Sequence, residues 1–259
     1  MNVLTIEHLT KAYSERVLLD DTSFSLQEGE KVGVIGVNGM GKSTLLKIIA
    51  GVEEPDAGRV IMGNHVKIGY LPQTPVFDKD QTVLGAVLEG TLENPEDFVG
   101  ESEAKAMLAS LGFSDFGQPV HELSGGQKRR AAIAGVIAMN PKVLILDEPT
   151  AGLDPKGRDE LFDLIRELHE KMDMTVLLVS HSMEDMANYV QRIVVLNHGT
   201  LMLDGTPSEV FSHVQELEQV SLAAPQVTYL MKDLEKAGFP VDTTVTTIEE
   251  AKKEIIKLC

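Results

Sequence analysis

Short apolar runs alternate along the chain with segments in which apolar residues recur every three or four positions. The runs have the length of buried parallel strands, and three of them are KVGVIG (Lys31–Gly36), VLIL (Val143–Leu146) and TVLLV (Thr175–Val179). Helices are expected at Lys42–Ala50 and from Pro155 to about Lys171, with Asp154 as the N-cap of the second. The alternation predicts an α/β domain with a largely parallel sheet.

Two further regions have a different pattern. From about Pro75 to Leu123 the chain is acidic and helical in period, which predicts a helical subdomain inserted in the core. After Gly205 only helical patterns remain: Thr206 and Glu209 form a capping box, and Thr246 with Glu249 is expected to cap the last helix. We therefore expect one domain over residues 1–215, with the helical subdomain at about 75–140, and a helical extension over residues 216–259.

Composition narrows the class of protein. The chain has 259 residues, of which 43% are hydrophobic, and this is enough for one large core. A net charge of -17 disfavours a DNA-coating or RNA-coating role. One cysteine, Cys259, excludes a disulfide within the chain, and apolar runs such as Val176–Val179 are too short to cross a bilayer. We expect a cytoplasmic protein whose link to a membrane, if it has one, comes through a partner.

A phosphate-binding loop follows the first apolar run. The segment GVNGMGKST satisfies the G-x-x-x-x-G-K-[ST] pattern between a strand and a helix. Backbone N–H groups would wrap the phosphates of a nucleotide, Lys42 would reach the β- and γ-phosphates, and Ser43 would ligate Mg²⁺. The predicted binding residues are Gly36, Asn38, Gly39, Gly41, Lys42, Ser43 and Thr44. The loop alone fits GTPases, kinases and many ATPases.

The segment LSGGQ, Leu123–Gln127, makes the prediction more specific. Together with the loop it resembles the signature of ATP-binding-cassette (ABC) proteins. The resemblance implies a P-loop NTPase fold with a RecA-like core, an antiparallel β subdomain, the inserted helical subdomain and the small C-terminal extension. It also implies a dimer, in which Ser124, Gly126 and Gln127 of one subunit close over ATP held by the other.

The same resemblance assigns roles to residues outside the loop. Asp147 and Glu148 end the VLIL run: Asp147 would help to hold Mg²⁺, and Glu148 would polarise the attacking water. Gln73 corresponds to a glutamine that contacts Mg²⁺ and couples to the helical subdomain. His181 corresponds to a switch histidine near the γ-phosphate, and Tyr13 to an aromatic residue stacked on adenine. The six other histidines show no zinc-site spacing.

The resemblance divides between two subfamilies. Residues 1 to roughly 125, including VKIGYLPQ and EAKAMLASLGF, look most like half of an ABC-F protein, a soluble tandem cassette that acts on ribosomes. From about Gln127 onward, AAIAGVIAMNPKVLILDEPTAGLDPKGRDELFDLIREL resembles the ATPases of energy-coupling-factor (ECF) transporters. We hypothesise a chimera of the two subfamilies, natural or engineered.

Three functions follow from these patterns. The first is the ATPase subunit of an ECF-type transporter, paired with a second ABC ATPase subunit and with integral-membrane subunits. The second is a soluble ABC module whose ATP cycle moves no solute. A ribosomal role is disfavoured, because one cassette is present instead of two and no long basic linker is visible. The third, a module that only binds ATP, conflicts with the intact Lys42, Ser124, Glu148 and His181.

Overall fold

The computed structural model describes residues 1–92 and 100–258, so residues 93–99 of the predicted helical subdomain and Cys259 lie outside it. The chain forms two compact units. Unit 1 comprises Met1–Val3, Gln27–Gly29 and Met62–Leu177. Unit 2 comprises Leu4–Leu26, Glu30–Ile61 and the chain from Leu178 onward. The domain limits expected from the sequence, 1–215 and 216–259, remain a prediction.

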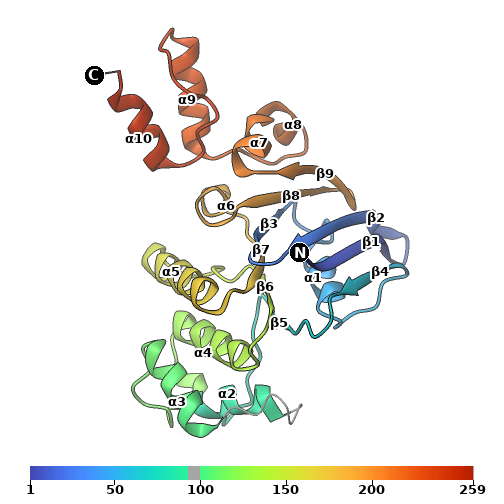
Figure 1. Ribbon diagram of the computed structural model, residues 1–259, viewed down its shortest axis with the longest axis vertical. Coiled ribbons are helices and arrows are strands. Elements are labelled where there is room, and N and C mark those ends of the chain that lie inside the picture. The colour runs from blue at the N-terminus through green and yellow to red at the C-terminus, as the bar shows by residue number, and fades with distance from the viewer. Residues whose placement is uncertain (93–99, 259) are drawn as a thin grey trace. The chain divides into compact units, whose positions relative to one another are not determined.

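In its described residues, unit 1 combines the parallel strands β5 and β6 with the helices α2, α3, α4 and α5 (Figure 1). Tyr70 of β5 pairs with Ile145 of β6, and every residue of β6 is buried. The next strand, β7, is equally buried and carries the chain from unit 1 into unit 2. The elements are β5 (Ile68–Leu71), α2 (Val83–Leu92), α3 (Glu101–Ser110), the 3₁₀ turn η2 (Val120–Glu122), α4 (Gly125–Ala138), β6 (Val143–Asp147), α5 (Pro155–Met172) and β7 (Thr175–Val179).

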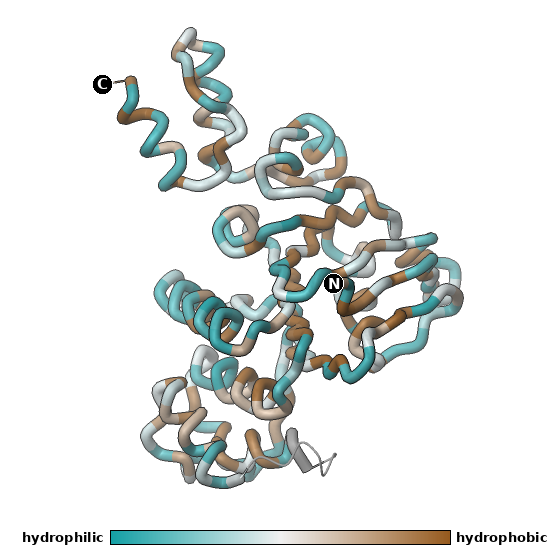
Figure 2. The backbone as a smooth tube through the Cα atoms, in the orientation of Figure 1, coloured by the Kyte–Doolittle hydropathy of each residue, from teal (hydrophilic) through white to brown (hydrophobic). Residues whose placement is uncertain are grey.

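Helices α2, α3 and α4 share a core of their own. The brown segments of Figure 2 mark hydrophobic residues along these helices. Val87 and Leu108 are fully buried in it, together with Ala134 of α4. Gly135 lets α2 and α4 approach closely, because a Cβ there would lie 3.0 Å from the carbonyl oxygen of Ala86. The predicted helical character of this region is therefore confirmed for the described residues.

Unit 2 contains the phosphate loop and most of a three-stranded β-sheet. The strands β1, β2 and β4 form a three-stranded sheet in the order β2-β1-β4, and β3 pairs in parallel with β8, which pairs antiparallel with β9. The elements before the loop and around it are β1 (Asn2–Tyr13), β2 (Arg16–Gln27), β3 (Lys31–Ile35), α1 (Lys42–Ile49) and β4 (Ala57–Met62). Those after β7 are α6 (Met183–Tyr189), β8 (Arg192–Asn197), β9 (Thr200–Gly205), α7 (Pro207–Ser212), α8 (Val214–Gln219), α9 (Gln226–Lys236) and α10 (Ile248–Ile256).

The caps of the helices test the sequence analysis directly. Asp154 caps α5 through the Gly157 amide, and Thr206 with Glu209 forms the capping box of α7, both as predicted. The prediction for the last helix was wrong by one residue. Thr247 and Glu250, and not Thr246 and Glu249, form the capping box of α10. Among the described residues, no helix has both the length and the hydrophobicity needed to cross a bilayer.

Candidate functional site: a phosphate loop and a carboxylate pair

The phosphate loop lies in unit 2 between β3 and α1. Its backbone is tightly packed: a Cβ on Gly36 would lie 2.5 Å from the Leu196 carbonyl oxygen, and one on Gly41 would lie 2.4 Å from that of Leu18. Gly39 and Gly41 have φ values of 76° and 87°, in the left-handed region that glycine adopts without strain. Only glycine therefore fits the two ends of the loop.

Lys42 points back into this loop. Its side chain is only 5% exposed, and its ammonium group donates to the carbonyl oxygens of Gly36 at 2.7 Å and Val37 at 3.1 Å. A buried cation enclosed by backbone amides at a helix N-terminus is suited to a phosphate group. Ser43 and Thr44 occupy the first turn of α1, and Asn38 is exposed on the loop. The loop thus fits the triphosphate of a nucleotide.

Tyr13 ends β1 on the same unit and is 49% exposed. Its hydroxyl donates to the Glu53 carboxylate, and this bond raises the pKa of Tyr13, whereas the Thr44 side chain lowers it. The Lys11 ammonium lies 5.6 Å from the centre of the ring. The exposed ring therefore stands beside the first turn of α1, where it is available for stacking on a base.

One side-chain contact to the phosphate loop, from Arg16, is not among the contacts predicted from the sequence. The Arg16 guanidinium donates to the Gly39 carbonyl oxygen at 2.7 Å. No pattern around Arg16 indicates this, because the two residues are separated by 23 positions. His181, the remaining predicted residue of unit 2, is exposed and follows β7 after the buried Ser180.

The carboxylate pair lies in unit 1 at the end of β6. Asp147 is 2% exposed, and Glu148 has a φ of 48°, which is uncommon for a residue with a side chain. The Gln73 side-chain amide donates to the Glu148 carboxylate at 2.9 Å. Two of the predicted catalytic residues, which are 75 positions apart in the sequence, are thus in direct contact.

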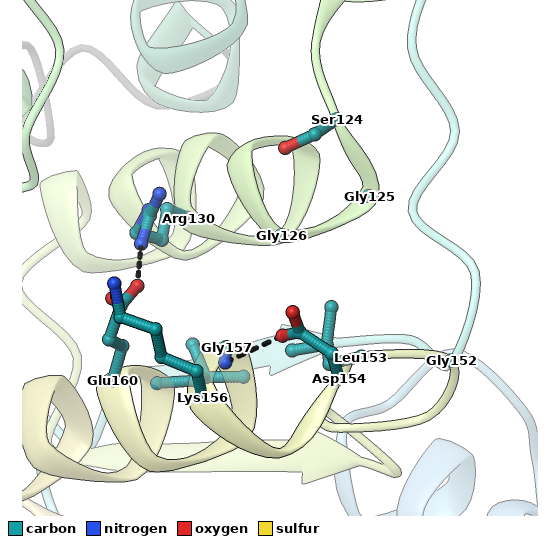
Figure 3. A pocket seen from close by; sticks show the side chains of 11 residues that line it. Ser124, Gly125, Gly126, Arg130, Gly152, Leu153, Asp154, Lys156, Gly157 and Glu160 are labelled. Carbon is teal, nitrogen blue, oxygen red and sulfur yellow. Dashed lines mark hydrogen bonds and ion pairs between the residues drawn. The ribbon is translucent and has the colours of Figure 1, made fainter.

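The signature segment begins α4 and faces a pocket of about 370 Å³ (Figure 3). Ser124 is the N-cap: its hydroxyl accepts from the Gln127 amide, while the Gln127 side chain accepts from the Ser124 amide. The N-terminus of α5, capped by Asp154, faces the same pocket. Two helix N-termini and the flexible backbone of Gly125 and Gly126 make this pocket suitable for an anion.

The sequence matches one family over half of its length. The pattern that defines the family described as ABC transporter matches residues 19–151. The chain belongs to the ABC transporter family. This membership confirms the predicted class of enzyme, an ATPase of the ABC type, and the predicted P-loop fold.

Individual relatives align with nearly the whole chain. "Energy-coupling factor transporter ATP-binding protein EcfA2" of Clostridium tetani is 43% identical over 278 residues, which cover 98% of this chain and 96% of the relative. The protein of the same name from Bacillus subtilis is 39% identical, with 93% of this chain and 95% of the relative covered. The solved structure of CbiO1 from Clostridium perfringens, described as part of the ABC transporter complex cbiONQ, has a TM-score of 0.70 and 32% identity, with 89% of this chain and 99% of that chain covered.

Proposed function

We propose that this protein is the ATPase subunit of an ECF-type transporter, and that it binds and hydrolyses ATP as a dimer with a second ABC ATPase subunit. The observation that carries the proposal is the hydrogen bond between Gln73 and Glu148. Gln73 follows β5 at the start of the segment that leads to α2, and Glu148 is the candidate for activating water. One bond therefore links the helical region to the catalytic carboxylate.

A groove beside that segment supports a membrane partner. Its volume is about 290 Å³, and it is lined by residues of β5, of the following segment, of α2 and of α4. Val76 at its edge is 90% exposed, and Phe77, Ala132 and Val136 add further apolar surface. An exposed apolar groove of this kind suits a helix of another subunit. The resemblance to ABC transporters supports the proposal that the groove receives the coupling helix of a membrane subunit.

Each predicted site residue is proposed to have its own role in ATP binding or hydrolysis. Lys42 and the loop amides bind and orient the phosphates, with Tyr13 beneath the base. Ser43, Gln73 and Asp147 are the proposed ligands of Mg²⁺, which neutralises phosphate charge and favours in-line attack when bound. Glu148 accepts a hydrogen bond from the attacking water or takes its proton, and His181 is proposed to contact the γ-phosphate. Ser124, Gly126 and Gln127 bind the nucleotide of the other subunit.

Hydrolysis and dimerisation are tested together. We expect the purified chain, alone or with a second ABC ATPase subunit, to hydrolyse ATP only with Mg²⁺, and Glu148→Gln to abolish hydrolysis while ATP still binds. Mass-resolved chromatography with ATP should show a dimer that is more stable in the Glu148→Gln variant. Unchanged hydrolysis in this variant would refute the assignment of Glu148.

The membrane partner is tested separately. Val76→Glu places a charge in the groove, and we expect it to abolish co-purification with ECF membrane subunits expressed in the same cell. Ile61→Glu, on β4, is the control, because Ile61 is 41% exposed and lies outside the groove. Equal co-purification of both variants would refute the assignment of the groove, and no co-purification of the wild type would favour the alternative, a soluble ABC module without transport.

The ABC-F resemblance and the chimera remain hypotheses. They predict a change of subfamily near Gln127, whereas the alignment to the Clostridium tetani relative covers 98% of this chain, on both sides of that residue. The relatives therefore lend the chimera no support, and the ECF-type proposal does not depend on it. The cytoplasmic side of a cell membrane, reached through the membrane partner, is the proposed location.

A further inference from the structure

A buried arginine lies behind the catalytic carboxylate. Arg129 is in the second turn of α4, on the same face as Ile133 and Ile137, which are 0% and 2% exposed. The Arg129 side chain is itself only 9% exposed. An arginine in such a position is rare unless its charge is paired.

The guanidinium of Arg129 reaches the segment that follows β6. One terminal nitrogen, Nη2, donates to the Ala151 carbonyl oxygen at 3.1 Å. The other, Nη1, is buried and has no hydrogen-bond partner among the described residues. The Ala151 amide in turn donates to the Glu148 carbonyl oxygen at 3.1 Å, which closes a turn just after the strained Glu148.

Packing alone does not explain this arginine. Burial lowers the pKa of Arg129, and the negative charge of Glu148 opposes that shift. A buried charge with one unpaired donor costs stability, and an apolar side chain of similar length would fill the same space at lower cost. Arg129 and Glu148 are therefore coupled electrostatically. Burying the guanidinium costs free energy that an apolar residue with a purely structural role would not cost.

We propose that Arg129 is a positioning residue for hydrolysis, which holds the turn Glu148–Ala151 against α4 so that the Glu148 carboxylate stays fixed relative to the signature segment. Gln73 contacts the Glu148 carboxylate from the segment after β5, so Glu148 is held from two parts of the chain. The inference rests on the proposed function in one respect: α4 also presents Ser124 to the other subunit's nucleotide. Arg129 then connects the turn that carries Glu148 to the helix that carries Ser124, both in unit 1.

The test compares Arg129→Met, which keeps the length and removes the charge, with Arg129→Lys, which keeps the charge and loses the forked donor. We expect Arg129→Met to lower kcat by at least about tenfold and to change KM for ATP by less than about twofold, because Arg129 holds the turn that carries Glu148 and does not contact the nucleotide. Arg129→Lys should recover part of kcat. Arg166→Met on α5, where the arginine forms an ion pair with Asp163 at the surface, controls for the loss of one cation.

A second measurement, hydrogen exchange, does not depend on ATPase activity. Amide hydrogen exchange at Ala151 and Leu153, whose amides close turns to Glu148 and Thr150, should be faster in Arg129→Met than in the wild type. The melting temperature should shift by no more than about 4 °C, because a buried group with one unpaired donor is removed together with one hydrogen bond. Global unfolding of the variant would indicate a structural role and overturn the proposal.

The two readouts separate this inference from the proposed function. If the wild type hydrolyses no ATP, the proposed function fails, and the exchange rates still decide the role of Arg129. Unchanged exchange at Ala151 and Leu153 in Arg129→Met would overturn the inference, whatever the activity. Unchanged kcat in an active protein would overturn it as well.

Discussion

Gly41 lies against the backbone of Leu18, so closely that a Cβ on Gly41 would come within 2.4 Å of the Leu18 carbonyl oxygen. Backbone cannot move aside as the end of a long side chain can. The φ of Gly41 is also 87°, which disfavours any side chain. The contact joins the last residue before α1 to β2, and it fixes the position from which the Lys42 side chain reaches into the loop.

We expect Gly41→Ala to destabilise the fold by at least about 3 kcal/mol, because backbone strain and overlap add. Gly51→Ala is the matched control: its φ is 71°, yet nothing lies within 4 Å of a Cβ at that position. It should cost only about 1–2 kcal/mol, from strain alone. Urea unfolding of both variants measures the difference. Equal costs would show that the loop can move away from Leu18.

The sequence predicted local features of this fold better than distant contacts. Asp154 and Thr206 were recognised as caps because their partners lie three residues away. The cap of α10 was placed one residue early, because TTIEE contains the same spacing in two registers and only the backbone selects Thr247. Both threonine amides donate to the Glu250 carboxylate, but it is the Thr247 hydroxyl that accepts from the Glu250 amide and completes the capping box.

In the candidate site, too, local features were predicted from the sequence and distant contacts were not. The position of Lys42 follows from its motif, whereas the Arg16 contact to Gly39 depends on how β2 approaches the loop. Arg129 gave a usable signal, since it shares a helical face with Ile133 and Ile137. What the sequence did not indicate is the group that the arginine meets there, because Ala151 lies 22 positions further along the chain.

Lys42 should be needed for nucleotide binding. We expect Lys42→Met to weaken ATP binding by at least about tenfold, because a cation-assisted hydrogen bond to phosphate is lost. Lys47→Met, in the last turn of the same helix and exposed, is the control and should bind ATP as the wild type does. Isothermal titration calorimetry without Mg²⁺ measures binding apart from hydrolysis. Equal affinities of the two variants would exclude the proposed role of Lys42.

Tyr13 should act through its ring and not through its hydroxyl. The hydroxyl is already engaged by Glu53, whereas the ring is exposed. We expect Tyr13→Phe to keep the affinity for ATP within about twofold and Tyr13→Ala to weaken it roughly three- to tenfold, the range of a lost stacking contact. Titration with a fluorescent ATP analogue provides the measurement. A loss in Tyr13→Phe equal to that in Tyr13→Ala would instead assign the role to the hydroxyl.

Asp56, which bonds to the C-terminal end of β1, should make the stability of the protein depend on pH. The Ala12 amide donates to its carboxylate at 2.8 Å, the Lys11 ammonium lies 3.2 Å away, and both lower the pKa of Asp56. A carboxyl whose pKa is lower in the folded protein stabilises it above its unfolded pKa of about 4, and this stabilisation is lost as the pH falls through the folded value. We therefore expect the wild type to melt at a higher temperature than Asp56→Asn at pH 7, with the difference shrinking below about pH 4.

Melting curves from pH 7 to pH 2.5 check this, with Asp80→Asn, at an exposed position on another segment, as the control. A difference between wild type and Asp56→Asn that stays constant with pH would show that the variant acts through packing and not through the charge of Asp56.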